Sequence, residues 1–114
     1  MKKINYLFFI LFAFVLFSCR DDFELTMERG IYFYKQGDVN KAMQEFNDVI
    51  FALSDESMSS NNRILLARAY YNLGLSYSKL EQYNRAINNM ENAIALDPKQ
   101  EYLDTIELIY KKSQ

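Results

Sequence analysis

Apolar side chains recur every three or four residues through most of the chain, and this spacing gathers them on one side of an α-helix. The clearest run consists of Tyr70, Leu73, Tyr77 and Leu80. A second apolar side follows it, made of Ala86, Ile87, Met90, Ala93, Ile94 and Leu96. The alternating pattern typical of strands does not occur, so the sequence predicts an all-α fold.

Turn-forming residues interrupt this helical pattern at three places. Gly37 and Asp38 mark one turn, because glycine and aspartate both favour turn conformations. Pro98 ends a helix, since proline restricts the residue before it to extended angles. Residues 54–62 are rich in serine and asparagine and indicate an insert, although they could also extend the flanking helices. Residues 101–112 have an apolar side and end in two lysines, which suits a helix dipole.

The first residues form a separate apolar segment. Lys2 and Lys3 carry positive charge ahead of an unbroken apolar and aromatic run at residues 6–17. As a helix this run would span about 18 Å, whereas a bilayer core is about 30 Å thick. Its length and charge are typical of a secretory signal peptide, and we expect residues 1–18 to be removed as one.

Residues 67–100 contain a series of motif positions in one register. In order they are Tyr70, Leu73-Gly74, Tyr77, Ala86, Met90, Ala93 and Asp97-Pro98. This series resembles the tetratricopeptide repeat (TPR), a helix-turn-helix unit of about 34 residues. A glycine inside a helix costs about 1 kcal/mol relative to alanine, and close approach of the two helices gives Gly74 a packing reason.

A second copy of the register lies 44 positions upstream, at residues 23–53. Its matching positions are Gly30, Phe33, Lys35-Gln36-Gly37-Asp38, Ala42, Phe46 and Val49. Thr26 replaces the usual aromatic residue and Arg29 replaces the usual leucine. First repeats are often atypical because one side faces solvent, so we expect Arg29 on that open side.

The TPR resemblance implies a short right-handed α-solenoid of two repeats and a capping helix. Its parts would be repeat one at 23–53, the insert at 54–62, repeat two at 67–100 and the capping helix at 101–112, within a domain of residues 23–114. In TPR proteins the first helix of each repeat, helix A, lines a concave groove that holds a protein or peptide partner. By register the groove would be lined by Met27, Ile31, Tyr34, Arg68, Tyr71, Asn72, Leu75, Ser78 and Lys79.

The alternative for these residues is that some belong only to the core between repeats. The family's carboxylate clamp, which binds a terminal carboxylate through several basic and amide side chains, is not reproduced. Only Asn72 would match it.

The apolar leader ends in Leu16-Phe17-Ser18-Cys19. This ending resembles a bacterial lipobox, with leucine three places before the cysteine and a small residue next to it. The resemblance implies a small bacterial lipoprotein in which the Cys19 thiol is diacylglycerated and the new N-terminal amine is acylated. Two other interpretations stay open, namely ordinary signal cleavage with a free Cys19 thiol and an uncleaved membrane anchor.

Residues 19–22 form a charged tether after the leader. The sequence Arg20-Asp21-Asp22 directly after the cysteine resembles the surface-export tag of some Gram-negative lipoproteins. This resemblance implies an outer-membrane lipoprotein exposed on the cell surface. The alternative is an ordinary solvated tether.

Composition narrows the possible chemistry. The chain has 13 basic and 15 acidic residues, and removal of Lys2 and Lys3 with the leader leaves 11 against 15, a net charge of −4. Nucleic acid is an unsuitable partner, because phosphate binding needs a cationic surface. Histidine is absent and Cys19 is the single cysteine, so the chain has no imidazole base or ligand and no internal disulfide.

The sequence also contains no phosphate-binding loop, no nucleophile paired with a base and no metal-ligand spacing. Asp55-Glu56 is interpreted as solvated surface, with calcium binding as a remote alternative. We therefore expect no enzymatic activity, no metal and no cofactor other than the covalent lipid on Cys19.

Two functions of different class fit these features. The first is a binding module that docks a helix or extended segment of a partner protein in the groove. The second is a structural subunit that stacks its repeats on another protein, or on a copy of itself, in an envelope complex. The oligomeric state separates the two.

Overall fold

A computed structural model describes residues 5–10, 22–55 and 58–114, and the regular structure within these ranges is helical. Most of the predicted leader, Cys19, Arg20 and Asp21 lie outside the described residues. Residues 5–10 form a short, exposed helix. Within the described ranges, the helices are too short or too polar to span a bilayer.

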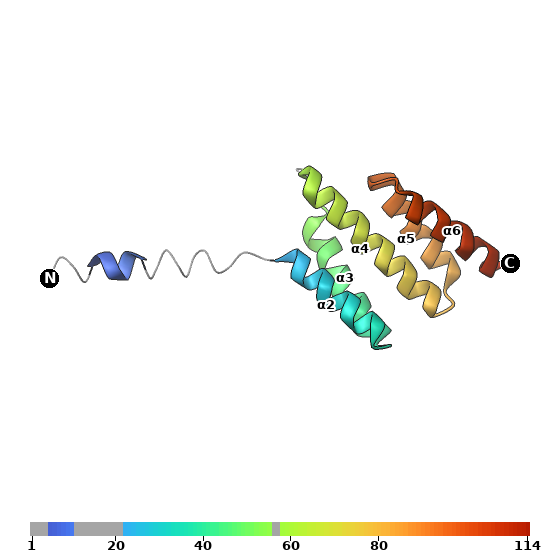
Figure 1. Cartoon of the computed structure of the whole chain (residues 1–114), viewed down its shortest axis with the longest axis horizontal. Coiled ribbons are helices and arrows are strands. Elements are labelled where there is room, and N and C mark those ends of the chain that lie inside the picture. Colours follow the sequence, from blue (N-terminus) through green and yellow to red (C-terminus); the bar gives the residue numbers. More distant parts are fainter. Residues whose placement is uncertain (1–4, 11–21, 56–57) are drawn as a thin grey trace.

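Two helical hairpins and a final helix make up the domain. The helices are α2 (Phe23–Lys35), α3 (Val39–Leu53), α4 (Ser60–Lys79), α5 (Tyr83–Leu96) and α6 (Gln100–Ser113). In Figure 1, α2, α4 and α6 form the nearer layer, and α3 and α5 lie behind them. The predicted all-α fold of two helix-turn-helix repeats with a capping helix is confirmed.

The break between the repeats is shorter than the expected insert at 54–62. Helix α4 already begins at Ser60, because the hydroxyl of Ser59 accepts a hydrogen bond from the Asn62 amide at 3.2 Å. Serine is a strong N-cap, so the polar residues that indicated a loop start a helix instead. Leu65 and Leu66 are buried and continue its apolar side. Helix α4 therefore extends about two turns ahead of residue 67.

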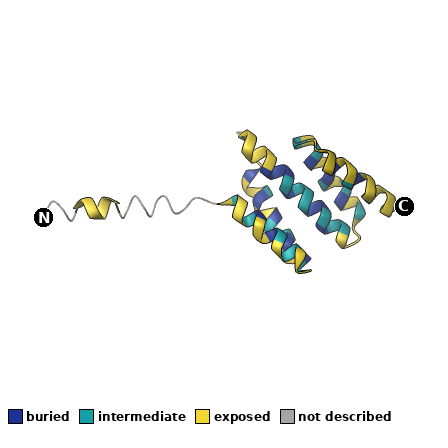
Figure 2. Cartoon of the chain, viewed as in Figure 1, coloured by how far each residue is buried: buried dark blue, intermediate teal, exposed yellow. Residues whose placement is uncertain are grey.

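Small residues let the two helices of each repeat approach closely. A Cβ atom on Gly74 would lie 3.0 Å from Met90 Cε and 3.2 Å from the backbone oxygen of Ala86. At the equivalent Gly30, it would lie 2.5 Å from a ring carbon of Phe46. No exposed surface remains at Ala42, Ala86 and Ala93. Figure 2 shows that the buried residues lie between the two helix layers.

The turn inside each repeat passes through the left-handed backbone region at the same position. Gly37 has φ 85° and Glu81, which lies 44 residues later, has φ 60°. Glycine adopts this conformation freely, whereas another L-residue loses about 1–2 kcal/mol there. The second turn therefore carries strain that the first avoids.

We expect Glu81→Gly to raise the free energy of unfolding by about 0.5–1 kcal/mol, because relief of strain exceeds the entropy cost of glycine. The matched change Gly37→Ala should lower it by about 1 kcal/mol. Nothing lies within 4 Å of a Cβ at Gly37, so the backbone alone sets this cost. Urea denaturation of the purified chain measures both, and a destabilised Glu81→Gly chain would contradict the strain.

Candidate partner-binding groove

Helices α2, α4 and α6 each carry the same arrangement of side chains. Residues at relative positions 0, 4, 7 and 11 share one side of a helix. These four-residue stripes are Glu24, Glu28, Ile31 and Lys35 on α2, Arg68, Asn72, Leu75 and Lys79 on α4, and Glu101, Thr105, Leu108 and Lys112 on α6. The third member of each stripe is apolar, and we call these residues the apolar row: Ile31, Leu75 and Leu108. The fourth member of each stripe is a lysine, and we call these residues the lysine row: Lys35, Lys79 and Lys112.

Two side-chain contacts hold the stripe of α2 beside that of α4. Near the start of the helices, an Arg68 guanidinium nitrogen lies 3.1 Å from a Glu24 carboxylate oxygen. Near their ends, the Lys79 ammonium lies 4.7 Å from the centre of the Tyr34 ring. An exposed ion pair contributes about 0–1 kcal/mol and an exposed cation–π contact about 0.5–1 kcal/mol. These contacts therefore align the stripes more than they stabilise the fold.

Tyr71 joins the stripe of α4 to that of α6. Its ring stacks on Tyr102, with centres 4.5 Å apart. Its hydroxyl lies 3.3 Å from a Glu101 carboxylate oxygen and 3.3 Å from the Thr105 hydroxyl. Burial raises the pKa of Tyr71 and, together with the nearby carboxylates of Asp97 and Glu101, raises the pKa of Tyr102 to about 12. Both hydroxyls therefore stay protonated at neutral pH, and the Tyr71 hydroxyl can donate to Glu101.

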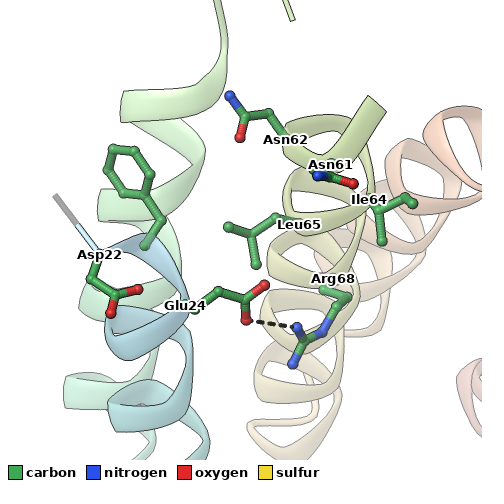
Figure 3. A pocket seen from close by; sticks show the side chains of 8 residues that line it. Asp22, Glu24, Asn61, Asn62, Ile64, Leu65 and Arg68 are labelled. Carbon is green, nitrogen blue, oxygen red and sulfur yellow. Dashed lines mark hydrogen bonds and ion pairs between the residues drawn. The ribbon is translucent and has the colours of Figure 1, made fainter. Parts of the chain in front are cut away.

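A pocket of about 400 Å³ lies between the first turns of α2 and α4. Its lining consists of Asp22, Phe23, Glu24, Asn61, Asn62, Ile64, Leu65 and Arg68. Figure 3 shows Glu24 and Arg68 reaching toward each other across it, with Leu65 between the helices. The early start of α4 creates this pocket, so sequence reasoning missed the four lining residues of α4 ahead of position 67, namely Asn61, Asn62, Ile64 and Leu65.

The prediction of Met27 as a groove residue is wrong. Met27 is fully buried in the cluster that also contains Phe46 and Leu65. It holds the same repeat position as Tyr71, and that position points toward the helix A of the next repeat. Helix α4 therefore covers Met27 as α6 half-covers Tyr71, and both side chains pack between repeats.

The other predicted groove residues keep part of their surface. Lys79 is exposed, and half-buried positions are Ile31, Tyr34, Arg68, Tyr71, Asn72, Leu75 and Ser78. The Asn72 amide nitrogen donates to the backbone oxygen of Arg68 at 2.8 Å, so this amide is committed to its own helix.

Sequence reasoning missed seven members of the stripes: Glu24, Glu28, Lys35, Glu101, Thr105, Leu108 and Lys112. The signal was present, since each stripe repeats the spacing of the one on α4. On α6 this signal is obscured, because residues 101–112 resemble a capping helix and not a third groove helix.

The described parts of the chain contain no group of three or more acidic or cysteine side chains that could hold a metal ion. Polar contacts between helices at the stripes are Arg68 with Glu24 and Tyr71 with Glu101 and Thr105. The arrangement can therefore bind a segment of protein through shape, apolar contact and charge.

Comparison with known proteins agrees with the helical repeats. Residues 67–100 match the sequence model of the family described as tetratricopeptide repeat. The chain is also similar to the human protein "Peptidyl-prolyl cis-trans isomerase FKBP4" [Homo sapiens], with 28% identity over 82 residues, which is 68% of this chain and 18% of that protein. It thus spans less than a fifth of that relative. The family match covers residues 67–100, which include most of the hairpin formed by α4 and α5, and proteins of that family generally bind protein partners.

Proposed function

We propose that the chain is a membrane-anchored lipoprotein whose TPR domain docks a helix or peptide of a partner protein across α2, α4 and α6. The apolar row carries this proposal. Leu108 on α6 is 57% exposed, while the equivalent Leu75 on α4 and Ile31 on α2 are half-buried. Apolar side chains rimmed by polar ones mark interaction sites, and an amphipathic helix binds such a surface through its own apolar side.

A pull-down with two α6 variants tests the groove. Leu108→Asp places a charge in the apolar row, whereas the matched control Leu103→Asp changes a residue of similar exposure (42%) that lies outside the stripe. The full chain is purified from detergent-solubilised membranes, and co-purified proteins are quantified by mass spectrometry. We expect Leu108→Asp to lose a partner that Leu103→Asp retains. Equal recovery with both variants would contradict docking at this surface.

The anchor rests on the lipobox resemblance of Leu16-Phe17-Ser18-Cys19. We propose the outer membrane as its location and the cell surface as its final side, following Arg20-Asp21-Asp22. No catalytic role is proposed, since recognition alone accounts for the surface described.

Surface export can be tested by protease treatment of whole cells. Asp22 also caps α2, because its carboxylate accepts a hydrogen bond from the Leu25 amide at 3.2 Å. The export variant should therefore be Asp21→Asn with Asp22→Asn, since asparagine removes the charge and still caps a helix. We expect the natural chain to be cleaved and the variant to be protected. Equal cleavage would contradict the export tag.

The alternative function, a structural subunit, is favoured by one uncovered side of α2. Helix α4 buries Ala69, Leu73 and Ser76 against its neighbours, and α6 buries the equivalent Tyr102, Ile106 and Ile109. On α2 the equivalent residues are covered by no other helix within the part of the chain that the structure describes. Leu25 is 60% exposed, Tyr32 is 58% exposed, and Arg29 pairs with Glu45 of α3 at 2.8 Å. Repeat domains gain stability from each covered interface, so a further helix seated here would stabilise the first repeat.

This alternative predicts that the purified chain associates. Light scattering should then give a molar mass that rises with concentration, and the melting temperature should rise with it, as mass action requires. Tyr32→Asp should abolish both effects. A monomer with a high, concentration-independent melting temperature would contradict the structural role.

A further inference from the structure

We propose, on the basis of the groove function above, that the docked segment is an acidic amphipathic helix. Its apolar side would lie on the apolar row, and its acidic side would face the lysine row. This assigns a chemical class to the partner and an orientation to its charged side.

The lysine row is distinguished by its lack of carboxylate partners. Among the lysines in the described part of the chain, three pair with an acid: Lys41 with Asp38, Lys99 with Asp97, and Lys111 with Glu107. The remaining three are the members of the lysine row. Lys79 lies over the Tyr34 ring, and Lys35 and Lys112 make no ion pair within the described residues. In a chain with more acidic than basic residues, the described lysines without an ion pair hold equivalent positions on three helices.

The row is not explained by the helix dipole alone. Lysine in the last turn favours the negative end of a helix on any side. Helix α6 ends in both Lys111 and Lys112, yet Lys111 turns to Glu107 at 3.0 Å. Only Lys112 continues the stripe that Glu101 and Thr105 begin beside Tyr71. Lys111 and Lys112 both lie in the last turn of α6, but only Lys112 is on the stripe and only Lys112 lacks an ion pair within the described residues. The unpaired lysines are therefore distinguished by their place on the stripe.

The opposite rim of the surface carries the other sign of charge. The first stripe positions hold Glu24 on α2 and Glu101 on α6, with Arg68 between them already paired to Glu24. Glu28 adds a further exposed carboxylate one turn later. An acidic segment is therefore repelled at the glutamate rim and attracted at the lysine row, and the two effects together fix which way its charged side faces.

The dimensions fit a helix of about four turns. We take the spacing of packed helices, about 8–10 Å, as the least separation between neighbouring lysines of the row. Residues seven apart on a helix are separated by about 10.5 Å along its axis and lie on nearly the same side. A helix of about 15 residues with acidic side chains at seven-residue intervals could therefore meet all three lysines.

Three synthetic helical peptides of about 15 residues test this assignment. They share a leucine side and differ only at three flanking positions, which are glutamate, glutamine or lysine. Fluorescence anisotropy measures their binding to the full chain in detergent micelles at low salt. We expect the glutamate peptide to bind about tenfold more tightly than the glutamine peptide, since three exposed ion pairs together provide about that factor. The lysine peptide should bind weakest.

A charge swap separates recognition from loss of fold. The triple variant Lys35→Glu, Lys79→Glu and Lys112→Glu should prefer the lysine peptide, whereas the control Lys111→Glu should keep the natural preference. Equal affinity for all three peptides, or no binding by any, would overturn the acidic-helix assignment. The groove function is tested separately by the Leu108→Asp pull-down. If that variant loses a partner while the three peptides bind equally, docking at the groove still stands. Only the role of the lysine row in selecting an acidic helix is then wrong.

Discussion

Ala86→Leu is expected to lower the free energy of unfolding by about 2–3 kcal/mol, the upper part of the cost of overpacking a tight core. Ala86 is fully buried, and its backbone oxygen lies 3.2 Å from the position of a Cβ on Gly74. The extra carbons would force α4 and α5 apart where their backbones approach most closely. A typical domain is stabilised by about 5–15 kcal/mol, so the melting temperature should fall clearly.

The control for this variant is Asn88→Leu on the exposed side of the same helix. It adds a leucine two residues away from Ala86 without entering the core, and surface changes are usually within about 0.5 kcal/mol. Thermal and urea unfolding of both variants measure the difference. Equal losses would mean that the register of α5 against α4 is wrong.

Cys19→Ala is expected to release the chain from the membrane. Cys19 follows the lipobox-like sequence, and attachment through two or more acyl chains is stable where one chain gives only marginal binding. Without the thiol no diacylglycerol can be added, so the protein should move from the membrane pellet to the soluble fraction. Intact mass of the natural chain should show the added acyl groups on a polypeptide that begins at Cys19.

Two results would contradict the lipid anchor. One is a natural chain whose mass carries no acyl groups, and the other is a Cys19→Ala chain that stays in the membrane after an alkaline wash. Unfolding measurements on the variant provide the control, since a folded variant in the soluble fraction excludes aggregation as the reason for its redistribution.

Much of the fold could be predicted because the local signals agree with the packing. Asp97 is extended and α5 stops at Leu96, as the following Pro98 requires. The expected capping helix at 101–112 differs from α6 by one residue at each end. Gly30 and Gly74 lie where two helices approach closely. A glycine inside a helix predicts such a close approach, because it is otherwise unfavourable there.

The remaining errors arise where distant segments meet. Met27 and Tyr71 share a repeat position, and only the nearness of α4 or α6 decides how far each is covered. The start of α4 depended on a cap at Ser59, which resembles loop sequence until the helix beyond it is seen. The stripe on α6 was hidden because its residues lie 33 positions after those of α4, whereas those of α4 lie 44 after those of α2.

Site-specific photo-crosslinking tests the central claim most directly, which is that α2, α4 and α6 hold a partner segment. A photoreactive residue is placed in turn at Ile31, Leu75 and Leu108 of the full chain in living cells. The comparison set occupies exposed positions on the other layer, at Asn47 of α3 and at Asn88 and Asn92 of α5. The account predicts one crosslinked protein species shared by the three apolar-row positions and absent from the comparison set. Crosslinks of equal yield from both layers, or from α3 and α5 alone, would contradict it.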